Sequence, residues 1–167
     1  MFALAMGTST IYAIARNESL LAQLKALAPG RIETFSGGTG SVSEWVKAHT
    51  SGTGADLMLD CLGAKASTDA LKDAMMGVRR GGRIVNIGGT GADMALNTKW
   101  WMDNSMELIG SAWLTTAEGI EISEMVRTGV IDLSVLEART FPMERINEAI
   151  NGAASGNGGF TNWVVEP

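Results

Sequence analysis

The chain has 167 residues, enough for one domain with a hydrophobic core, and its 46% apolar and 19% charged residues are ordinary for a globular protein. A formal net charge of −5 argues against nucleic acid or an anionic membrane surface as a partner. One cysteine excludes an internal disulfide, and one histidine excludes a His-rich metal cluster. No apolar run reaches the roughly 18 residues of a membrane span, and the first residues lack signal-peptide features. We therefore expect a cytoplasmic protein that does not enter a membrane.

Apolar periodicity and turn residues predict alternating strands and helices. The expected strands cover residues 10–15, 31–35, 57–62, 84–87, 106–112 and 162–165. The expected helices cover residues 1–6, 18–28, 41–50, 67–80 and 115–129, with a last one around residues 146–150. We expect Gly81 and Gly82 to break the helix that ends at Arg80, and residues 151–159 to form a loop. This alternation predicts an α/β fold with a parallel sheet covered on both faces.

Residues 54–89 form the centre of this pattern as a strand, a crossover helix and a strand. In open parallel sheets, ligands bind beyond the carboxyl ends of the strands. Those ends here are residues 61–63 and 87–89. Their glycines would let a flat or phosphorylated ligand approach the backbone closely, or they simply make tight turns, and both interpretations stay open.

Residues 36–43 form a glycine-rich turn that nearly matches the dinucleotide fingerprint, since Gly38 and Gly40 are followed by Ser43. Asp60, 20 residues after Gly40, stands where a ribose-binding acid would lie. The third glycine of the fingerprint is absent, and the preceding strand is short. We therefore prefer the interpretation of an ordinary turn.

Other residues have a chemical and a structural interpretation. Arg16 directly follows a strand, so its guanidinium could grip an adenosine 2′-phosphate, or it is a surface arginine beside the helix cap Asn17. Cys61 has no cysteine or histidine partner in the pattern, which favours a small buried apolar residue over a nucleophile. We interpret the pair Trp100 and Trp101 as a subunit contact and Trp113 as adjacent to the site.

Residues 54–63, 80–88 and 107–111 resemble the cofactor-binding half of medium-chain, zinc-type alcohol dehydrogenases and quinone reductases. Residues 125–131, 141–149 and 162–165 resemble that family's carboxyl-terminal return into its catalytic domain. The resemblance implies a Rossmann-like, doubly wound parallel sheet. It also implies two parts, a partial NAD(P)-binding domain of residues 1–135 and a carboxyl-terminal segment of residues 136–167.

The family's first strand, its glycine-rich loop and its zinc-binding catalytic domain would all precede Met1. The resemblance therefore implies a carboxyl-terminal part of such an enzyme, with an incomplete sheet that lacks its central strand and is marginally stable alone. Zinc, if used, would belong to the other domain. We assign neither a catalytic residue nor a metal ligand in this chain.

In the family an acid after the second strand reads the NAD ribose, and here that position is Ala15, followed by Arg16. This pattern implies NADP, with NAD as the other possibility. Residues 61–63 would line the adenosine, and residues 88–89 and 111–113 the nicotinamide. Asn162 stands where the family has a basic residue, so the resemblance does not imply that phosphate contact here. The implied cofactor-binding residues are Arg16, Asn17, Cys61, Leu62, Gly63, Gly88, Gly89, Ser111, Ala112 and Trp113.

The resemblance further implies hydride transfer between an alcohol, or an activated double bond, and nicotinamide. We expect the chain to be inactive alone and to form a homodimer through the edge from Trp100 to Ser111. The alternative is a non-catalytic, Rossmann-like binding or regulatory module.

Overall fold

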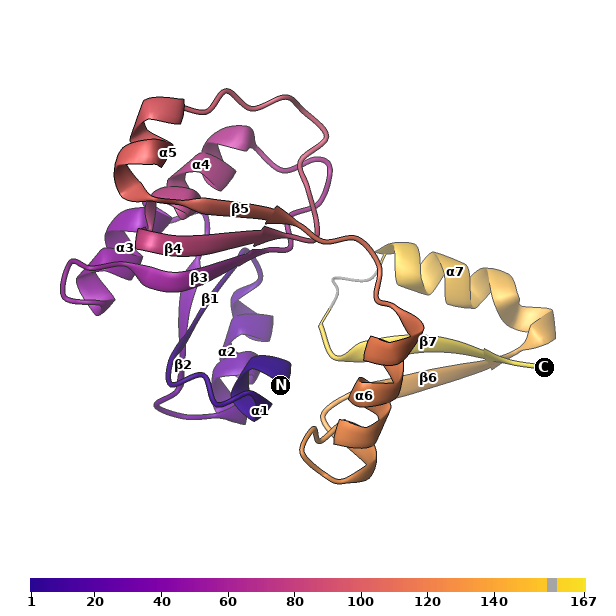
Figure 1. The fold of residues 1–167 in the computed structure, drawn as a ribbon. Helices are drawn as coiled ribbons and strands as arrows, with labels where there is room; N and C mark the ends of the chain where they lie inside the picture. Colours follow the sequence, from indigo (N-terminus) through magenta and orange to yellow (C-terminus); the bar gives the residue numbers. More distant parts are fainter. Residues whose placement is uncertain (156–158) are drawn as a thin grey trace. The chain divides into compact units, whose positions relative to one another are not determined.

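The computed structural model describes residues 1–155 and 159–167 (Figure 1). The chain divides into two compact units, one of residues 12–113 and one of residues 1–11 together with 114–167. This division after residue 113 does not coincide with the predicted domain boundary after residue 135. That predicted boundary is not tested by the division and stays a prediction.

The unit of residues 12–113 alternates between strands and helices, as the sequence predicts (Figure 1). Its elements are β1 (Ile11–Ala15), α2 (Glu18–Leu27), β2 (Ile32–Ser36), α3 (Val42–His49), β3 (Ala55–Asp60), α4 (Thr68–Met76), β4 (Val78–Asn86), α5 (Thr98–Asn104) and β5 (Glu107–Gly110). Four of the helices begin after a polar residue whose side chain accepts a hydrogen bond from the first turn. These caps are Asn17, Ser41, Ser67 and Asn97.

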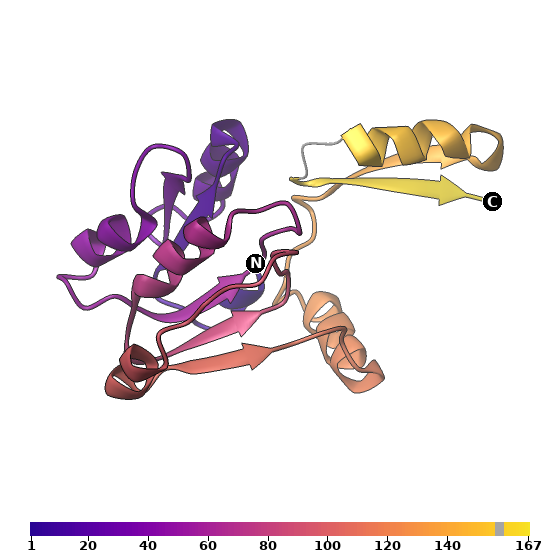
Figure 2. The same cartoon turned by 90° about the horizontal axis from the view of Figure 1, so that it is seen from above.

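The strands of this unit form two separate sheets. β3, β4 and β5 are parallel neighbours in that order, and both views show their arrows pointing the same way (Figures 1 and 2). β1 pairs with β2 only, so β1 and β3 do not pair within the described chain. The fold is therefore the predicted α/β class with a parallel sheet, and the predicted interruption lies between β1 and β3.

The core of this unit lies between α4 and the three-stranded sheet. Leu71 and Met75 of α4 pack with Val78 and Ile84 of β4, and all four are buried. The register places Met58 beside Ile84, and Met58 packs against the same cluster. Leu57 and Leu59, which alternate with Met58 and therefore point to the opposite face, are 55% and 54% exposed.

The end of α4 differs from the prediction. The helix stops at Met76, and residues 79–82 belong to β4 rather than to a helix end and its break. Val78 is pulled into the core at 6% exposure, which starts the strand early. The pairing with β3 then skips, because Ala55 opposes Val78 whereas Leu57 opposes Arg83. Gly81, with a φ of +69°, accommodates this irregularity.

Two further differences concern exposure and length. β1 was expected to be buried, but none of its residues is buried and Ile14 is 41% exposed, because β1 is paired on one side only. α5 was not predicted, and β5 is limited to four residues rather than covering residues 106–112. Ser111 and Ala112 consequently lie beyond the strand.

The second unit contains α1 (Phe2–Ala5), α6 (Thr116–Arg127), β6 (Glu137–Pro142), η1 (Met143–Arg145), α7 (Ile146–Ser155) and β7 (Thr161–Glu166). The predicted start of α6 is confirmed by a capping box between Thr115 and Glu118. β6, which was not predicted, pairs in parallel with β7 and places Arg139 opposite Trp163.

α7 corrects the predicted loop of residues 151–159, because the helix continues through Ser155. Residues 156–158 of that predicted loop lie outside the described residues. A side chain at Gly152 would overlap the ring of Trp163, so the glycine lets this helix lie close to β7. No helix among the described residues is long and apolar enough to cross a membrane.

Candidate functional site

The three parallel strands end in one row. Asp60 of β3 pairs with Asn86 of β4, which pairs with Gly110 of β5. The segments that follow these residues therefore start side by side at one end of the sheet. We call residues 61–63, 87–89 and 111–113 the carboxyl edge. The structure thus brings together eight of the ten residues predicted to bind a cofactor.

Asp60 holds this edge together. Its side chain is 1% exposed, and its Oδ1 accepts a hydrogen bond from the Leu62 amide at 2.9 Å, while Oδ2 accepts one from Asn86 Nδ2 at 3.0 Å. Its carbonyl oxygen accepts from the amides of Ile87 and Gly88 at 3.1 and 2.9 Å. Because both carboxylate oxygens are buried and bonded, Asp60 is not available to a ribose. The weaker interpretation of this residue as a ribose-binding acid is wrong.

The glycines of the edge have two different roles. A Cβ at Gly88 would overlap the carbonyl oxygen of Leu62 and would lie 2.8 Å from the carbonyl carbon of Cys61. Gly88 is therefore required for the close approach of two loops. A Cβ at Gly63 would meet nothing within 4 Å, and Gly89 has a φ of +110° with only the Asn86 side chain nearby. Gly63 therefore presents uncovered backbone at the edge, whereas Gly89 is half-buried and its positive φ favours glycine.

The segment after β5 continues the hydrogen bonding of the sheet. The amide of Ser111 donates to the carbonyl oxygen of Asn86 at 2.9 Å. Ser111 and Ala112 are exposed, and the Trp113 side chain is 94% exposed. The hydrogen bond to β4 thus fixes the backbone at Ser111, whereas the indole of Trp113 is almost fully exposed to solvent.

Cys61 is exposed rather than buried as predicted, because it lies one residue beyond the last pair of β3. Partial burial of the sulfur, and then the negative charge of Asp60, raise the pKa of the Cys61 thiol. A raised pKa keeps the thiol protonated at neutral pH, which argues against a nucleophile. This agrees with the expectation that Cys61 is not a nucleophile, although the expected burial is wrong.

Arg16 and Asn17 follow β1 in the two-stranded sheet. Asn17 Oδ1 accepts a hydrogen bond from the Leu20 amide at 3.1 Å, so its predicted role as a helix cap is confirmed. Arg16 is exposed, and its side chain has no hydrogen bond or ion pair within the described part of the chain. Among the described residues, no hydrogen bond or ion pair joins Arg16 or Asn17 to the carboxyl edge.

In the glycine-rich turn after β2, the amides of three residues donate hydrogen bonds to carbonyl oxygens of the same chain. Gly37 donates to the carbonyl oxygen of Ala15 at 2.9 Å, and Gly38 and Thr39 donate to that of Ser36 at 2.8 and 3.1 Å. Amides that are bonded within the chain cannot cradle a phosphate. This supports the interpretation of an ordinary turn.

The pairing of Asp60 with Asn86 was not predicted. A signal for it exists in the sequence, because these two polar residues end consecutive apolar strands of one strand–helix–strand unit. Parallel neighbours place such ends side by side.

A metal site is not formed within the described residues, since they contain no group of three or more His, Cys, Asp or Glu side chains that could hold an ion.

Comparison with known families gives one match. A family model described as zinc-binding dehydrogenase matches residues 1–132. A sequence search of curated proteins finds no match.

Several solved structures have a similar fold. Alcohol dehydrogenase TADH from Thermus sp. ATN1 matches with a TM-score of 0.84 and 18% identity, over 99% of this chain and 46% of that chain. Benzyl alcohol dehydrogenase from Acinetobacter calcoaceticus matches with a TM-score of 0.77 and 20% identity, over 95% of this chain and 43% of that chain. A quinone oxidoreductase from Pseudomonas syringae pv. Tomato DC3000 matches with a TM-score of 0.73 and 18% identity, over 99% and 51%. The chain therefore spans about half the length of these proteins, and at such identities the likeness concerns the fold.

Proposed function

Because the chain belongs to the zinc-binding dehydrogenase family, we propose that it is the nicotinamide-dinucleotide-binding part of an oxidoreductase. The observation that carries this proposal is the carboxyl edge of β3, β4 and β5, where three segments start side by side. Open parallel sheets bind nucleotides at such an edge.

The residues present fit a dinucleotide in two respects. Gly63 has no neighbour where a side chain would be, so a flat group can lie directly against its backbone. At the neighbouring strand end, a Cβ on Gly89 would meet only Asn86 Oδ1, at 3.7 Å, so a ligand can also come close to this backbone. We assign residues 61–63 to the adenosine and residues 88–89 and 111–113 to the nicotinamide. A bound nicotinamide dinucleotide would supply the hydride chemistry, and this chain would hold and orient it.

We further propose a preference for NADP, which rests on Arg16. Its guanidinium is exposed and has no hydrogen-bonding or ionic partner among the described residues, and the residue before it, Ala15, carries no charge. A free guanidinium can bind the two oxygens of a 2′-phosphate, whereas the ribose of NAD offers only hydroxyl groups.

The test of this preference is the variant Arg16→Ala in the 167-residue chain. We expect the ratio of NADPH to NADH affinity, measured by titration calorimetry, to fall about tenfold because one charge-assisted bidentate contact is lost. Arg80→Ala is the control, since Arg80 is an exposed arginine of β4 outside the edge. An unmodified chain that binds NADH as tightly as NADPH would contradict the preference. A chain that binds neither would support the alternative, a non-catalytic module.

For the whole protein we propose hydride transfer between nicotinamide and an alcohol or an activated double bond. The similar structures described above are alcohol dehydrogenases and a quinone oxidoreductase, which supports this range of substrates. No residue of the carboxyl edge has the properties of a general acid or base, so we propose that the chain alone has no turnover. Zinc, if the enzyme uses it, would be bound by other residues than these.

We also propose a homodimer in the cytoplasm, formed through the edge from Trp100 to Ser111. All four residues of β5 are exposed, and β5 pairs with β4 on one side only. An unpaired, exposed strand edge is a surface to which a second copy can add its own strand.

A further inference from the structure

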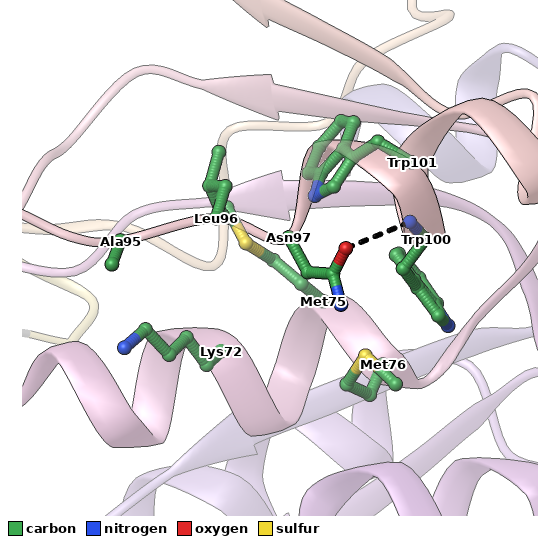
Figure 3. A pocket seen from close by; sticks show the side chains of 8 residues that line it. All are labelled: Lys72, Met75, Met76, Ala95, Leu96, Asn97, Trp100 and Trp101. Atoms are coloured by element: carbon green, nitrogen blue, oxygen red, sulfur yellow. Dashed lines mark hydrogen bonds between the residues drawn. The ribbon is translucent and has the colours of Figure 1, made fainter.

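A concave space of about 350 Å³ lies between α4, the loop that follows β4, and α5 (Figure 3). All of its lining residues belong to the unit of residues 12–113, and none of them belongs to the carboxyl edge. This volume is at the lower end of the range of about 300–1,000 Å³ that is typical of small-molecule sites. The space is therefore large enough for a ligand of modest size but not for a dinucleotide.

The walls of this space are apolar. Met75 forms its base and is part of the buried core, and Trp101 packs against the same core cluster. The rings of Trp100 and Trp101 meet edge to face, with 6.3 Å between their centroids. Met76 and Leu96 complete the lining and are 39% and 37% exposed. Thioether and indole surfaces of this kind adapt to a hydrocarbon chain or an aromatic ring.

The two most polar side chains of the lining, Lys72 and Asn97, both offer hydrogen-bond donors. Asn97 Oδ1 accepts a hydrogen bond from the Trp100 amide at 3.0 Å, which leaves the Asn97 amide nitrogen to donate (Figure 3). The Lys72 ammonium has no hydrogen bond or ion pair within the described part of the chain. No acidic side chain lines the space. The complementary ligand must therefore bring a negative charge and acceptor atoms together with an apolar body.

We propose that this space binds a small amphipathic carboxylate, with its hydrocarbon part against Met75, Trp100 and Trp101 and its carboxylate toward Lys72. The charge complementarity with a single lysine favours one carboxylate over a polyanion. The proposal does not depend on the dinucleotide proposed for the carboxyl edge, because the two sites share no residue.

The first test compares octanoate with octanol and octylamine, which have the same chain length and different head groups. In titration calorimetry of the 167-residue chain, we expect saturable 1:1 binding of octanoate, about fivefold tighter than octanol, with octylamine weakest. Lys72→Gln should reduce the preference for octanoate over octanol to nearly one. Lys47→Gln, a lysine of α3 outside the space, should leave it unchanged.

The second test fills the space. Ala95 lines it and is exposed, so Ala95→Phe should weaken octanoate binding at least tenfold without disturbing the core. Ala92→Phe, in the same loop but outside the lining, is the matched control. The proposal is overturned if binding does not saturate, if octylamine binds as tightly as octanoate, or if Ala95→Phe has no effect. Trp100 and Trp101 also belong to the edge proposed for the homodimer, so the titrations are made at protein concentrations at which sedimentation shows a monomer. The proposal is also overturned if octanoate does not bind that monomer.

Discussion

The two sheets of the unit of residues 12–113 differ in the buried side chains and hydrogen bonds that stabilise them. The three-stranded sheet has a buried cluster beneath α4 and the bonded pair of Asp60 and Asn86 at its end. The two-stranded sheet has no buried residue in β1, and its buried residues come one each from α2, β2 and α3. The first sheet fixes backbone positions, and the second carries a free charged side chain, Arg16, after an open strand. We infer that the first sets where a cofactor lies and the second which cofactor is preferred.

Gly88→Ala should have the largest effect, because it adds a methyl group at the closest backbone contact of the three-stranded sheet. The new methyl group would overlap the Leu62 carbonyl oxygen and lie 2.8 Å from the carbonyl carbon of Cys61, neither of which is a flexible group. We expect the free energy of unfolding, measured by urea denaturation, to fall by about 3 kcal/mol. Gly63→Ala is the matched control and should change it by less than about 0.5 kcal/mol, since nothing lies within 4 Å of that site. Equal losses in the two variants would show that the edge is not held by this contact.

Asp73→Asn should have a smaller effect, because it weakens the link between the two regions. Asp73 of α4 accepts hydrogen bonds from the hydroxyls of Ser41 and Ser43 at 2.8 and 2.7 Å and from the Val42 amide at 2.6 Å. We expect a loss of about 1 kcal/mol in the free energy of unfolding at pH 7, since the site is partly exposed.

The same contact predicts a pH dependence. Burial acts to raise the pKa of Asp73, but the hydrogen bonds from Ser43, Ser41 and Val42 outweigh it, so the pKa lies below its ordinary value of 3.8. A lowered pKa in the folded state means that the stabilisation is complete above about pH 4 to 5 and is lost as the pH falls through the folded value. The difference between the parent and Asp73→Asn should therefore shrink below pH 4. The control Asp93→Asn, at an exposed loop position, should change the free energy of unfolding at pH 7 by less than about 0.5 kcal/mol.

Much of the fold can be predicted from local sequence, because caps and periodic apolar residues act within one element. Asn17 and Thr115 start helices as predicted, since a cap needs only the next turn. β6 was not predicted, because its pairing partner β7 lies beyond a helix and its last residue is Pro142. Residues 79–82 belong to β4 for a similar reason, since the pairs that Val78 and Arg83 make with β3 lie on either side of them.

In the candidate site, too, the features set by local sequence could be predicted and those set by distant partners could not. The positions of residues 61–63 and 88–89 at strand ends could be predicted, because glycines and apolar runs mark where strands stop. The burial of Asp60 and the exposure of Cys61 could not, because they depend on Asn86 and on the last register pair of the sheet. Side chains alternate along every strand, but the pairing register decides which alternate set is buried, and a single segment does not encode that register.

The most direct test of the central claim is a backbone amide NMR map of the 167-residue chain titrated with NADPH. The account predicts that the largest shift changes fall on residues 61–63, 88–89 and 111–113, with a second group at Arg16 and Asn17. Changes confined to other residues, or none at about 1 mM NADPH, would contradict it.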